Sequence, residues 1–176
     1  MSEKDDRETV YEELSGEAGL RKVAELIKHV RIAMLTTVAK DGTMSSRPMA
    51  MQDKPFDGTL WFLTRSSSEK VDEISNDQKV TLAFAEPKDS IFVALKGTAS
   101  VNQDRAKINE LWNPMYKAWF PGGEADPQIA VLQVDVYEGD FWEASGSRLI
   151  RLARYAAAAA SGGSVPVGRA GHVTVS

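Results

Sequence analysis

Hydrophobic and polar residues alternate along most of the middle of the chain, in short runs that turn residues separate. Six of these runs have the alternation and the β-branched and aromatic content of strands. They are residues 31–38, 43–51, 59–64, 80–87, 90–101 and 129–144, the last long enough for one or two strands. An Asp41-Gly42 pair between the first two runs is a strong hairpin signal. The pattern predicts a small antiparallel barrel that is mostly β, with helices at its margins.

Four other segments have the features of helices. Residues 15–30 place apolar side chains three and four positions apart, which makes one apolar stripe. The other three segments are residues 67–76, residues 104–120 with a break at Pro114, and the alanine-rich residues 147–160. We expect one folded domain over residues 15–160, between a mobile acidic arm at residues 1–14 and a mobile tail at residues 161–176.

Composition narrows the classes of function. The 176 residues include no cysteine and only two histidines, His29 and His172. We therefore expect no thiolate catalysis, no disulfide, no iron–sulfur cluster and no multi-histidine metal site. The net charge of −4 offers no basic footprint, so we expect no nucleic acid partner and no membrane partner. Without a signal-peptide pattern at the amino terminus, the expected location is cytoplasmic.

The segment FLTRSSSEK, residues 62–70, joins a predicted strand to a predicted helix. Ser66 and Glu69 fit a capping box that would begin the helix at Ser67. A helix start offers unpaired backbone N–H groups, and here Thr64, Ser67, Ser68 and Lys70 add three hydroxyls and one cation. The segment is a candidate phosphate site. The alternative is an ordinary capped surface helix with a solvated lysine.

Two further segments bear on this hypothesis. Arg47 lies within a predicted strand and precedes Pro48, so it needs an anionic partner unless it lies on an exposed edge. If strands 44–51 and 59–64 are neighbours, Arg47 and the segment from Thr64 to Lys70 converge on one phosphate. Trp142 lies near the end of the last strand, with Arg148 six residues later; by itself this pattern favours a core tryptophan and a surface arginine over a ligand site.

Taken together, these segments resemble the flavin-binding split-barrel family of pyridoxamine 5′-phosphate oxidase, and within it the bacterial general stress protein branch. The resemblance runs from Gly16 to Tyr155. The segments that carry it are AMLTTVAKDGTMSSRPM, LWFLTRSSSEKVDEI, LWNPMYKAWFPGG and FWEASGSRLIR. It implies a six-stranded antiparallel Greek-key split barrel and a homodimer with FMN at the subunit interface.

The resemblance also implies roles for individual residues. Arg47 matches the family's strand arginine, and Pro48 and Met49 would run beside the flavin. Leu63 and Thr64 match the strand end that contacts the cofactor, while Ser68 and Lys70 match the phosphate-binding pair. Trp142 would reach the flavin bound mainly by the other subunit.

This sequence departs from the oxidase at several of the family's positions. Glu69 replaces a basic residue, Gln52 replaces a substrate-binding lysine, and Arg148-Leu149-Ile150 lacks a histidine of the substrate motif. A phosphorylated substrate would lose its charged partners there, so we expect no oxidation of pyridoxamine phosphate.

Three functions stay open on the sequence. The first is an FMN-dependent oxidoreductase that acts on an unidentified small-molecule electron donor or acceptor, with no catalytic residue identified. The second is a flavin-binding or redox-sensing stress protein without turnover. The third, a barrel for another planar cofactor such as heme or a deazaflavin, lacks a plausible axial ligand.

Overall fold

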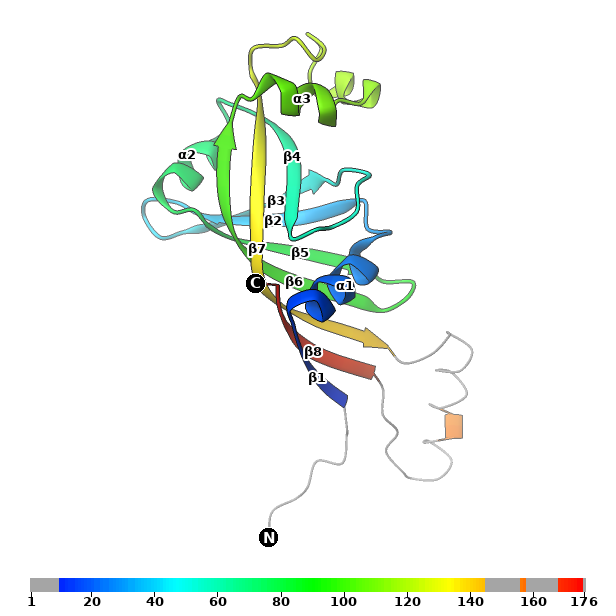
Figure 1. Cartoon of the computed structure of the whole chain (residues 1–176). Helices are drawn as coiled ribbons and strands as arrows, with labels where there is room; N and C mark the ends of the chain where they lie inside the picture. Colours follow the sequence, from blue (N-terminus) through cyan, green and yellow to red (C-terminus); the bar gives the residue numbers. More distant parts are fainter. Residues whose placement is uncertain (1–9, 145–155, 158–167, 176) are drawn as a thin grey trace.

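The computed structural model describes residues 10–144, 156–157 and 168–175, and these form a single eight-stranded sheet with helices at its ends (Figure 1). The first four strands are β1 (Val10–Ser15), β2 (Ile32–Val38), β3 (Met44–Ala50) and β4 (Thr59–Arg65). The other four are β5 (Lys79–Glu86), β6 (Ile91–Asn102), β7 (Ile129–Ala144) and β8 (Gly168–Thr174). The helices are α1 (Gly16–Ile27), α2 (Glu69–Asn76), α3 (Arg105–Leu111) and the 3₁₀ turn η1 (Pro114–Ala118).

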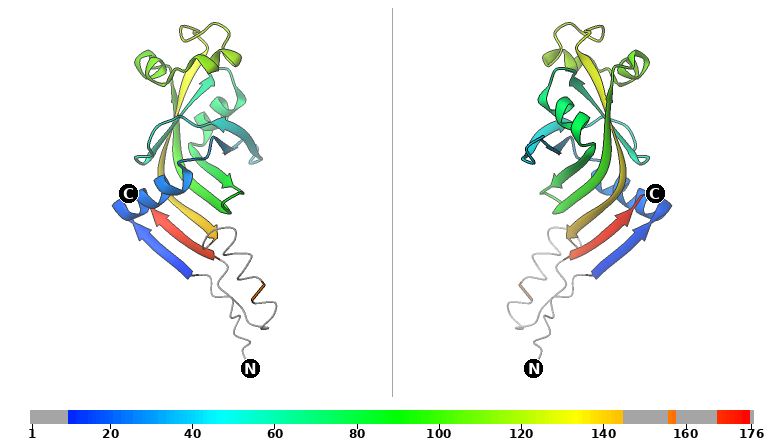
Figure 2. Two further views of the ribbon diagram at one scale, coloured as in Figure 1. Left: turned by 90° about the vertical axis from the view of Figure 1, so that its right-hand side faces the viewer. Right: turned by 90° about the vertical axis from the view of Figure 1, so that its left-hand side faces the viewer.

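The strand order is β1-β8-β7-β6-β5-β2-β3, and β4 pairs with β7 beside this path. The first half of β7 pairs with β4 on one side and with β6 on the other. Its second half continues along β6 and pairs with β8 in place of β4. In the two side views, β1 and β8 extend the sheet below the part that α3 covers (Figure 2). One long strand therefore connects the curved upper sheet to a flatter lower extension.

The prediction of a mostly β fold with flanking helices is confirmed, and all six predicted runs form strands. The expected hairpin at Asp41-Gly42 joins β2 to β3, with Gly42 at a φ of 84°. The prediction of six antiparallel strands is wrong in number and direction. The sheet has eight strands, and β1 runs parallel to β8.

The predicted arm and tail, residues 1–14 and 161–176, also need correction where the structure describes them. Residues 10–14 belong to β1, and residues 168–174 form β8, which pairs with both β1 and β7. Each segment is too polar or too rich in glycine to be identified as a strand alone. Each becomes a strand because a partner distant in sequence satisfies its backbone hydrogen bonds. The predicted helix at 147–160 lies outside the described residues, except at residues 156–157, which are helical.

Alternating side chains from the strands form the core beneath α1. Phe62, Leu132 and Phe141 are completely buried there, and Val23 and Ile27 of α1 pack against the same cluster. A smaller cluster lies under α3 and η1 and includes Ile108, Phe120 and Ile129. Among the described helices, none combines the length and the hydropathy that crossing a bilayer requires. The two clusters fix the sheet at one end by α1 and at the other by the α3–η1 segment.

The pairing of β1 with β8 can be tested at Gly171. A Cβ atom there would lie 2.4 Å from the carbonyl oxygen of Glu12 and 2.6 Å from the ring of Phe141. Gly171→Ala should lower the free energy of unfolding by about 1–3 kcal/mol, the usual cost of overpacking. Urea unfolding followed by tryptophan fluorescence measures it. The control is Arg169→Ala on the same strand, where the side chain is exposed; an equal loss in both variants would contradict the packing.

Candidate functional site

A cavity of about 350 Å³ lies where the ends of β3 and β4 approach the start of α2 and the η1 turn. Its walls are mostly apolar or aromatic, and its polar groups gather at the β4–α2 junction. The lining residues are Ile32, Pro48, Met49, Ala50, Leu63, Thr64, Arg65, Ser68, Lys70, Tyr116, Trp119 and Phe120. Such a mixture suits a flat, apolar ligand that carries a polar or charged end.

The polar end of the cavity is built around the Lys70 ammonium. Its Nζ atom donates to Thr64 Oγ1 at 3.1 Å and to Ser68 Oγ at 3.2 Å. Thr64 is buried at the end of β4, and Ser68 Oγ donates to the Arg65 carbonyl at 2.8 Å. Within the described part of the chain, no carboxylate forms an ion pair with Lys70. A half-buried cation is therefore held by hydroxyl groups alone.

The electrostatic environment of Lys70 favours a bound anion. Burial lowers the pKa of the Lys70 ammonium from its usual value, and the positive charge of Arg47 lowers it further. The carboxylate of Glu73 opposes these effects but does not cancel them. Keeping Lys70 charged therefore costs the folded protein free energy, and an anion bound in the cavity would offset this cost.

Helix α2 begins two residues later than the capping box predicts. Ser68, not Ser66, is the N-cap residue, and its side chain forms no capping bond to the helix. Its hydroxyl is engaged by the Arg65 carbonyl and by the Lys70 ammonium instead. The predicted capping box is wrong: the Ser66 backbone N–H donates to the Gln128 carbonyl, and the helix begins only after Ser68. As a result, Lys70 lies at the second helical position and reaches back toward Thr64.

Arg47 lies next to this group but is committed to a partner within the chain. Its Nη2 atom donates to Glu73 Oε2 at 2.8 Å, and its Nη1 atom donates to Thr37 Oγ1. Thr37 in turn donates to Glu73 Oε2 at 2.5 Å, which closes a three-residue ring. Thr37 and Glu73 are buried, with 0% and 9% of their surfaces exposed. The anion that Arg47 needs is therefore a carboxylate of α2.

The Glu73 carboxyl is held in its ionised form. The hydrogen bond from Thr37 lowers the pKa of Glu73, and the bond and charge of Arg47 lower it further against the opposing effect of burial. Glu73 lies three residues after Lys70, so the two side chains share one face of α2. The site therefore contains two cations with different partners. Arg47 of β3 forms an ion pair with Glu73, whereas Lys70 is bonded to hydroxyl groups.

Three aromatic residues in and after η1 line the cavity: Tyr116, Trp119 and Phe120. Gln52 donates to the Tyr116 hydroxyl at 2.9 Å, and burial raises the pKa of Tyr116, so the phenol is neutral. The Arg65 guanidinium lies 5.5 Å from the Phe120 ring and donates to the Trp119 carbonyl at 2.5 Å. Arg65 therefore fastens the aromatic cover to the end of β4.

The structure brings most of the predicted site residues together. Six of them line the cavity: Pro48, Met49, Leu63, Thr64, Ser68 and Lys70. Arg47 lies beside it, in the ring with Glu73. Ser67 is exposed and does not line it. Trp142 lies on the second half of β7 opposite Phe92, with 49% of its surface exposed, and within this chain it is not part of the cavity.

The site residues that were missed in the sequence include Thr37, Glu73 and Tyr116. Thr37 occupies the inward-facing alternation of β2, where a hydroxyl among apolar residues is a usable signal. Glu73 follows Lys70 by three positions in a predicted helix, which places it on the same face. Tyr116 offers no local signal, because only the tertiary position of η1 brings it over the cavity.

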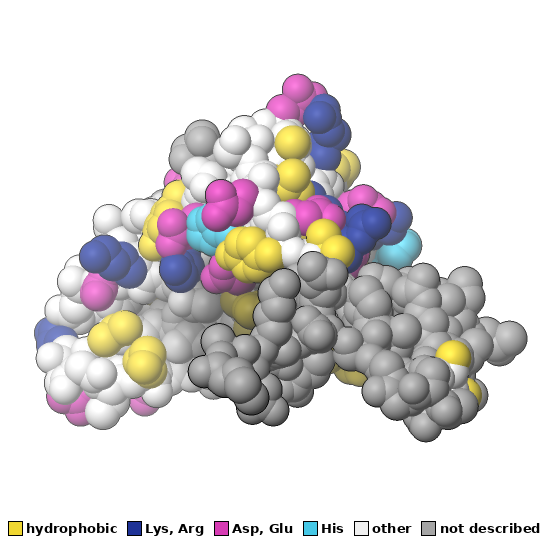
Figure 3. Space-filling model, turned by 90° about the horizontal axis from the view of Figure 1, so that it is seen from below, with side chains coloured by type: hydrophobic (Ala, Val, Ile, Leu, Met, Phe, Trp, Pro, Cys, Tyr) yellow, Lys and Arg dark blue, Asp and Glu magenta, His cyan; other side chains and the backbone are white. Residues whose placement is uncertain are grey.

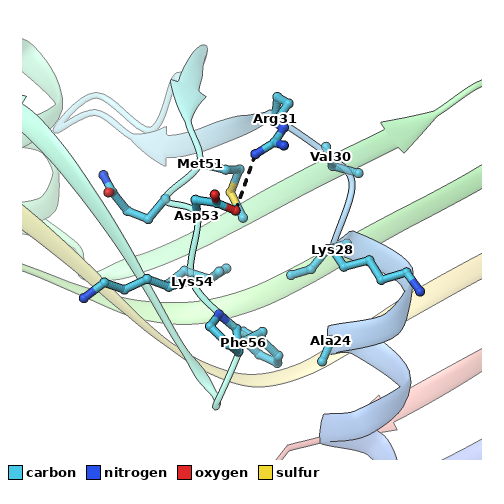
Figure 4. A pocket seen from close by; sticks show the side chains of 12 residues that line it. Ala24, Lys28, Val30, Arg31, Met51, Asp53, Lys54 and Phe56 are labelled. Atoms are coloured by element: carbon cyan, nitrogen blue, oxygen red, sulfur yellow. Dashed lines mark ion pairs between the residues drawn. The ribbon is translucent and has the colours of Figure 1, made fainter. Parts of the chain in front are cut away.

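A second cavity of about 330 Å³ lies between the end of α1 and the segment from Met51 to Phe56. Figure 4 shows an ion pair between Arg31 and Asp53 across it, with a separation of 3.6 Å. In the same view the ammonium groups of Lys28 and Lys54 point away from each other and out of the cavity. The charges of this cavity do not converge on a ligand, in contrast to those around Lys70.

The fold and the site together define a β-sheet protein with a half-buried lysine ammonium at one edge of a mostly apolar cavity. The profile of the "Pyridoxamine 5′-phosphate oxidase like" family matches residues 18–166. The chain therefore belongs to this family. The resemblance inferred from the sequence is confirmed.

Solved structures agree with this assignment. A protein from Jannaschia sp. CCS1 assigned as general stress protein 26 has a TM-score of 0.73 at 22% identity, over 88% of this chain and 96% of the other. The general stress FMN/FAD binding protein of Xanthomonas citri has a TM-score of 0.63 at 28% identity, over 73% of this chain and 90% of the other. The first likeness concerns the fold alone.

A curated relative is protein bli-3 of Neurospora crassa, which is 32% identical to this chain over 114 residues. The match covers 59% of this chain and 54% of the relative. The chain thus spans about half the length of this curated relative.

Proposed function

We propose that this protein is an FMN-binding member of the general stress branch of its family and acts as a flavin-dependent oxidoreductase. The observation that carries the proposal is the half-buried Lys70 ammonium, which meets only the hydroxyls of Thr64 and Ser68 at the edge of an apolar cavity. The description of the Xanthomonas citri protein as FMN/FAD binding supports a flavin.

The polar end of the cavity fits a phosphate monoester. Lys70 supplies a cation, and Thr64 and Ser68 supply hydroxyl donors, so a dianion there would form charge-assisted hydrogen bonds. FMN carries its phosphate at the end of a short polar chain, and riboflavin lacks it. The donor set is therefore the part of the site that would separate these two ligands.

The remaining walls fit a flat ring system. Pro48, Met49 and Leu63 offer apolar surface and backbone groups, and Tyr116 and Trp119 offer aromatic surface. When bound, the flavin ring supplies hydride or electron transfer. The residues of the chain bind its phosphate, orient its ring and exclude water from it.

Oxidation of pyridoxamine phosphate is not part of the proposal. Gln52 stands where the oxidase has a substrate-binding lysine, and its amide is engaged by the neutral Tyr116 hydroxyl at 2.9 Å. A second phosphate would therefore meet no cation at that position. The other substrate motif, at residues 148–150, lies outside the described residues.

A second candidate function is flavin binding or redox sensing without turnover. Among the described residues, the titratable groups that line the cavity are Arg65, Lys70 and Tyr116, and all three are already hydrogen-bonded. A cavity whose lining offers neither carboxylate nor histidine suits a binding role as well as a reaction carried by the flavin alone.

We further propose that the active form is a homodimer. The sheet face turned away from the core exposes Ile32, Met34, Phe92 and Trp142, each between 40% and 51%. We call these four residues the open sheet face. Ile32 belongs both to this face and to the cavity lining. A second copy of the chain bound to the face would therefore complete the cavity and bring its own Trp142 toward the bound flavin ring.

The reaction partner in this proposal is a small-molecule electron donor or acceptor. Seen from below, acidic and basic side chains are interspersed on the described surface, with hydrophobic side chains between them (Figure 3). Such a surface lacks the continuous basic stripe with which proteins track nucleic acid. A small molecule entering the cavity beside the aromatic cover is the simpler partner.

Lys70→Ala tests the phosphate end. We expect FMN to bind more weakly by about 1.5–3 kcal/mol, the worth of a hydrogen bond to a charged group. Riboflavin should bind equally to both proteins, because it has no phosphate. Fluorescence titration with each flavin measures the two dissociation constants. An equal loss for both ligands would place the effect of Lys70 on the fold rather than on the phosphate.

Turnover separates the two candidate functions. The FMN-loaded protein is mixed with NADH or NADPH in the absence of oxygen, and the bleaching of the flavin absorption band is followed. An oxidoreductase should bleach faster than free FMN at the same concentration. A rate equal to that of free FMN would remove nicotinamide-driven turnover and favour the binding role.

Met34→Glu tests the dimer. The chain has a mass of 19.3 kDa, and light scattering should give twice this value for the unaltered protein and the single mass for the variant. The variant should be monomeric because the substitution would bury an uncompensated charge in the proposed interface. Val10→Glu is the control, because Val10 is 52% exposed on β1 but faces the other side of the sheet. A monomeric unaltered protein would refute the proposal.

A further inference from the structure

The two cations beside the cavity differ in their partners. Lys70 meets hydroxyl groups only, whereas Arg47 is bonded to the buried Glu73 carboxylate at 2.8 Å and to Thr37. The side chains of Arg47 and Glu73 are 19% and 11% exposed. The chain itself therefore supplies an anion to one of the two cations that the sequence assigns to a phosphate.

A buried carboxylate beside a phosphate site has a definite electrostatic effect. Glu73 shares a helix face with Lys70 and is ionised, so its negative charge opposes the positive charge that Arg47 contributes to the cavity. It would also repel a phosphate dianion held by Lys70. Charges at a partly buried site interact more strongly than they do in water, so this repulsion would weaken the binding of a phosphate.

We propose that Glu73 is an internal counter-anion that limits the affinity of this site for a phosphate-bearing flavin and so makes its loading reversible. The inference rests on the proposed function. Glu73 keeps Arg47 compensated when no flavin is bound, so the fold does not depend on a ligand phosphate. Glu73 is a positioning residue in this scheme, because it acts on the ligand through Arg47 and through its own charge.

Two features of the geometry support this role over a merely structural one. The ring of Arg47, Thr37 and Glu73 is complete without a ligand, since Thr37 Oγ1 donates to Glu73 at 2.5 Å and accepts from Arg47. Two of the five N–H groups of Arg47 donate within this ring, so the ring does not use all of its donors. Removing the charge of Glu73 would thus raise the affinity of the site for a phosphate, while a neutral acceptor at this position would keep the hydrogen bonds to Arg47 and Thr37.

The test is Glu73→Gln, which keeps the length of the side chain and an oxygen acceptor but removes the charge. FMN should bind about tenfold more tightly to the variant, since a gain of that size corresponds to ~1.4 kcal/mol. Riboflavin should bind to both proteins within twofold. The affinity for FMN should also fall more steeply with added salt in the variant, because the net positive charge at the phosphate has risen.

Asp72→Asn is the matched control. It removes the same charge from the same helix, but Asp72 is exposed on the solvent side of α2. It should change both dissociation constants less than twofold. If Glu73→Gln does not fold, Glu73→Met removes the same charge with an apolar chain of similar length and carries the same expectation.

The outcomes separate the inference from the proposed function. Tighter FMN binding with unchanged riboflavin binding supports the counter-anion. Unchanged or weaker FMN binding in both Glu73 variants overturns the inference and leaves flavin binding intact. Equal changes for FMN and riboflavin also overturn it, because a phosphate-specific role cannot act on riboflavin. An unaltered protein that binds neither flavin overturns the proposed function and the inference together.

Discussion

The length of β7 is the constraint on which the rest of the structure depends. Its 16 residues pair first with β4 and β6 and then with β6 and β8, so one strand holds both halves of the sheet. The pairing with β4 continues to Arg65, directly before the turn into α2. Because the end of β4 is held on the sheet, Thr64 and Arg65 have fixed positions. The site is therefore presented by a rigid strand end and not by a free loop.

The fixed position of this strand end explains why the two cations of the site, Lys70 and Arg47, have different partners. Lys70 reaches back to the hydroxyls of its own junction, Thr64 and Ser68, whereas Arg47 on β3 bonds to Glu73 in the next turn of α2. Lysine tolerates the unpaired position because its pKa can fall on burial, while arginine remains charged and needs a fixed anion. The assignment of a lysine to the open position and an arginine to the carboxylate thus follows from the chemistry of the two side chains.

The sequence predicted those parts of the molecule whose signals are local. The alternation of β2 to β7 and the Asp41-Gly42 turn located the strands, and the residues around Thr64 and Lys70 located the polar end of the cavity. β1 and β8 were missed because an acidic and a glycine-containing segment become strands only through pairing with distant partners, β1 with β8 and β8 also with β7. Glu73 was missed for a similar reason: Arg47 visibly needed an anion, but nothing local showed that α2 would supply it. Long-range partners are set by the tertiary fold.

The two ends of the cavity place different demands on the assembly. Every determinant of the polar end, from Lys70 to Glu73, belongs to one chain and is already hydrogen-bonded in it. The ring end is built from surfaces that belong partly to the open sheet face, through Ile32, and partly to the aromatic cover around Tyr116 and Trp119. In the proposed flavoprotein, affinity would therefore be set within each subunit, whereas the surroundings of the ring, and with them its redox behaviour, would depend on what covers that face. A change at Glu73 would alter how much flavin is bound, and a change at Trp142 would alter how the bound flavin behaves.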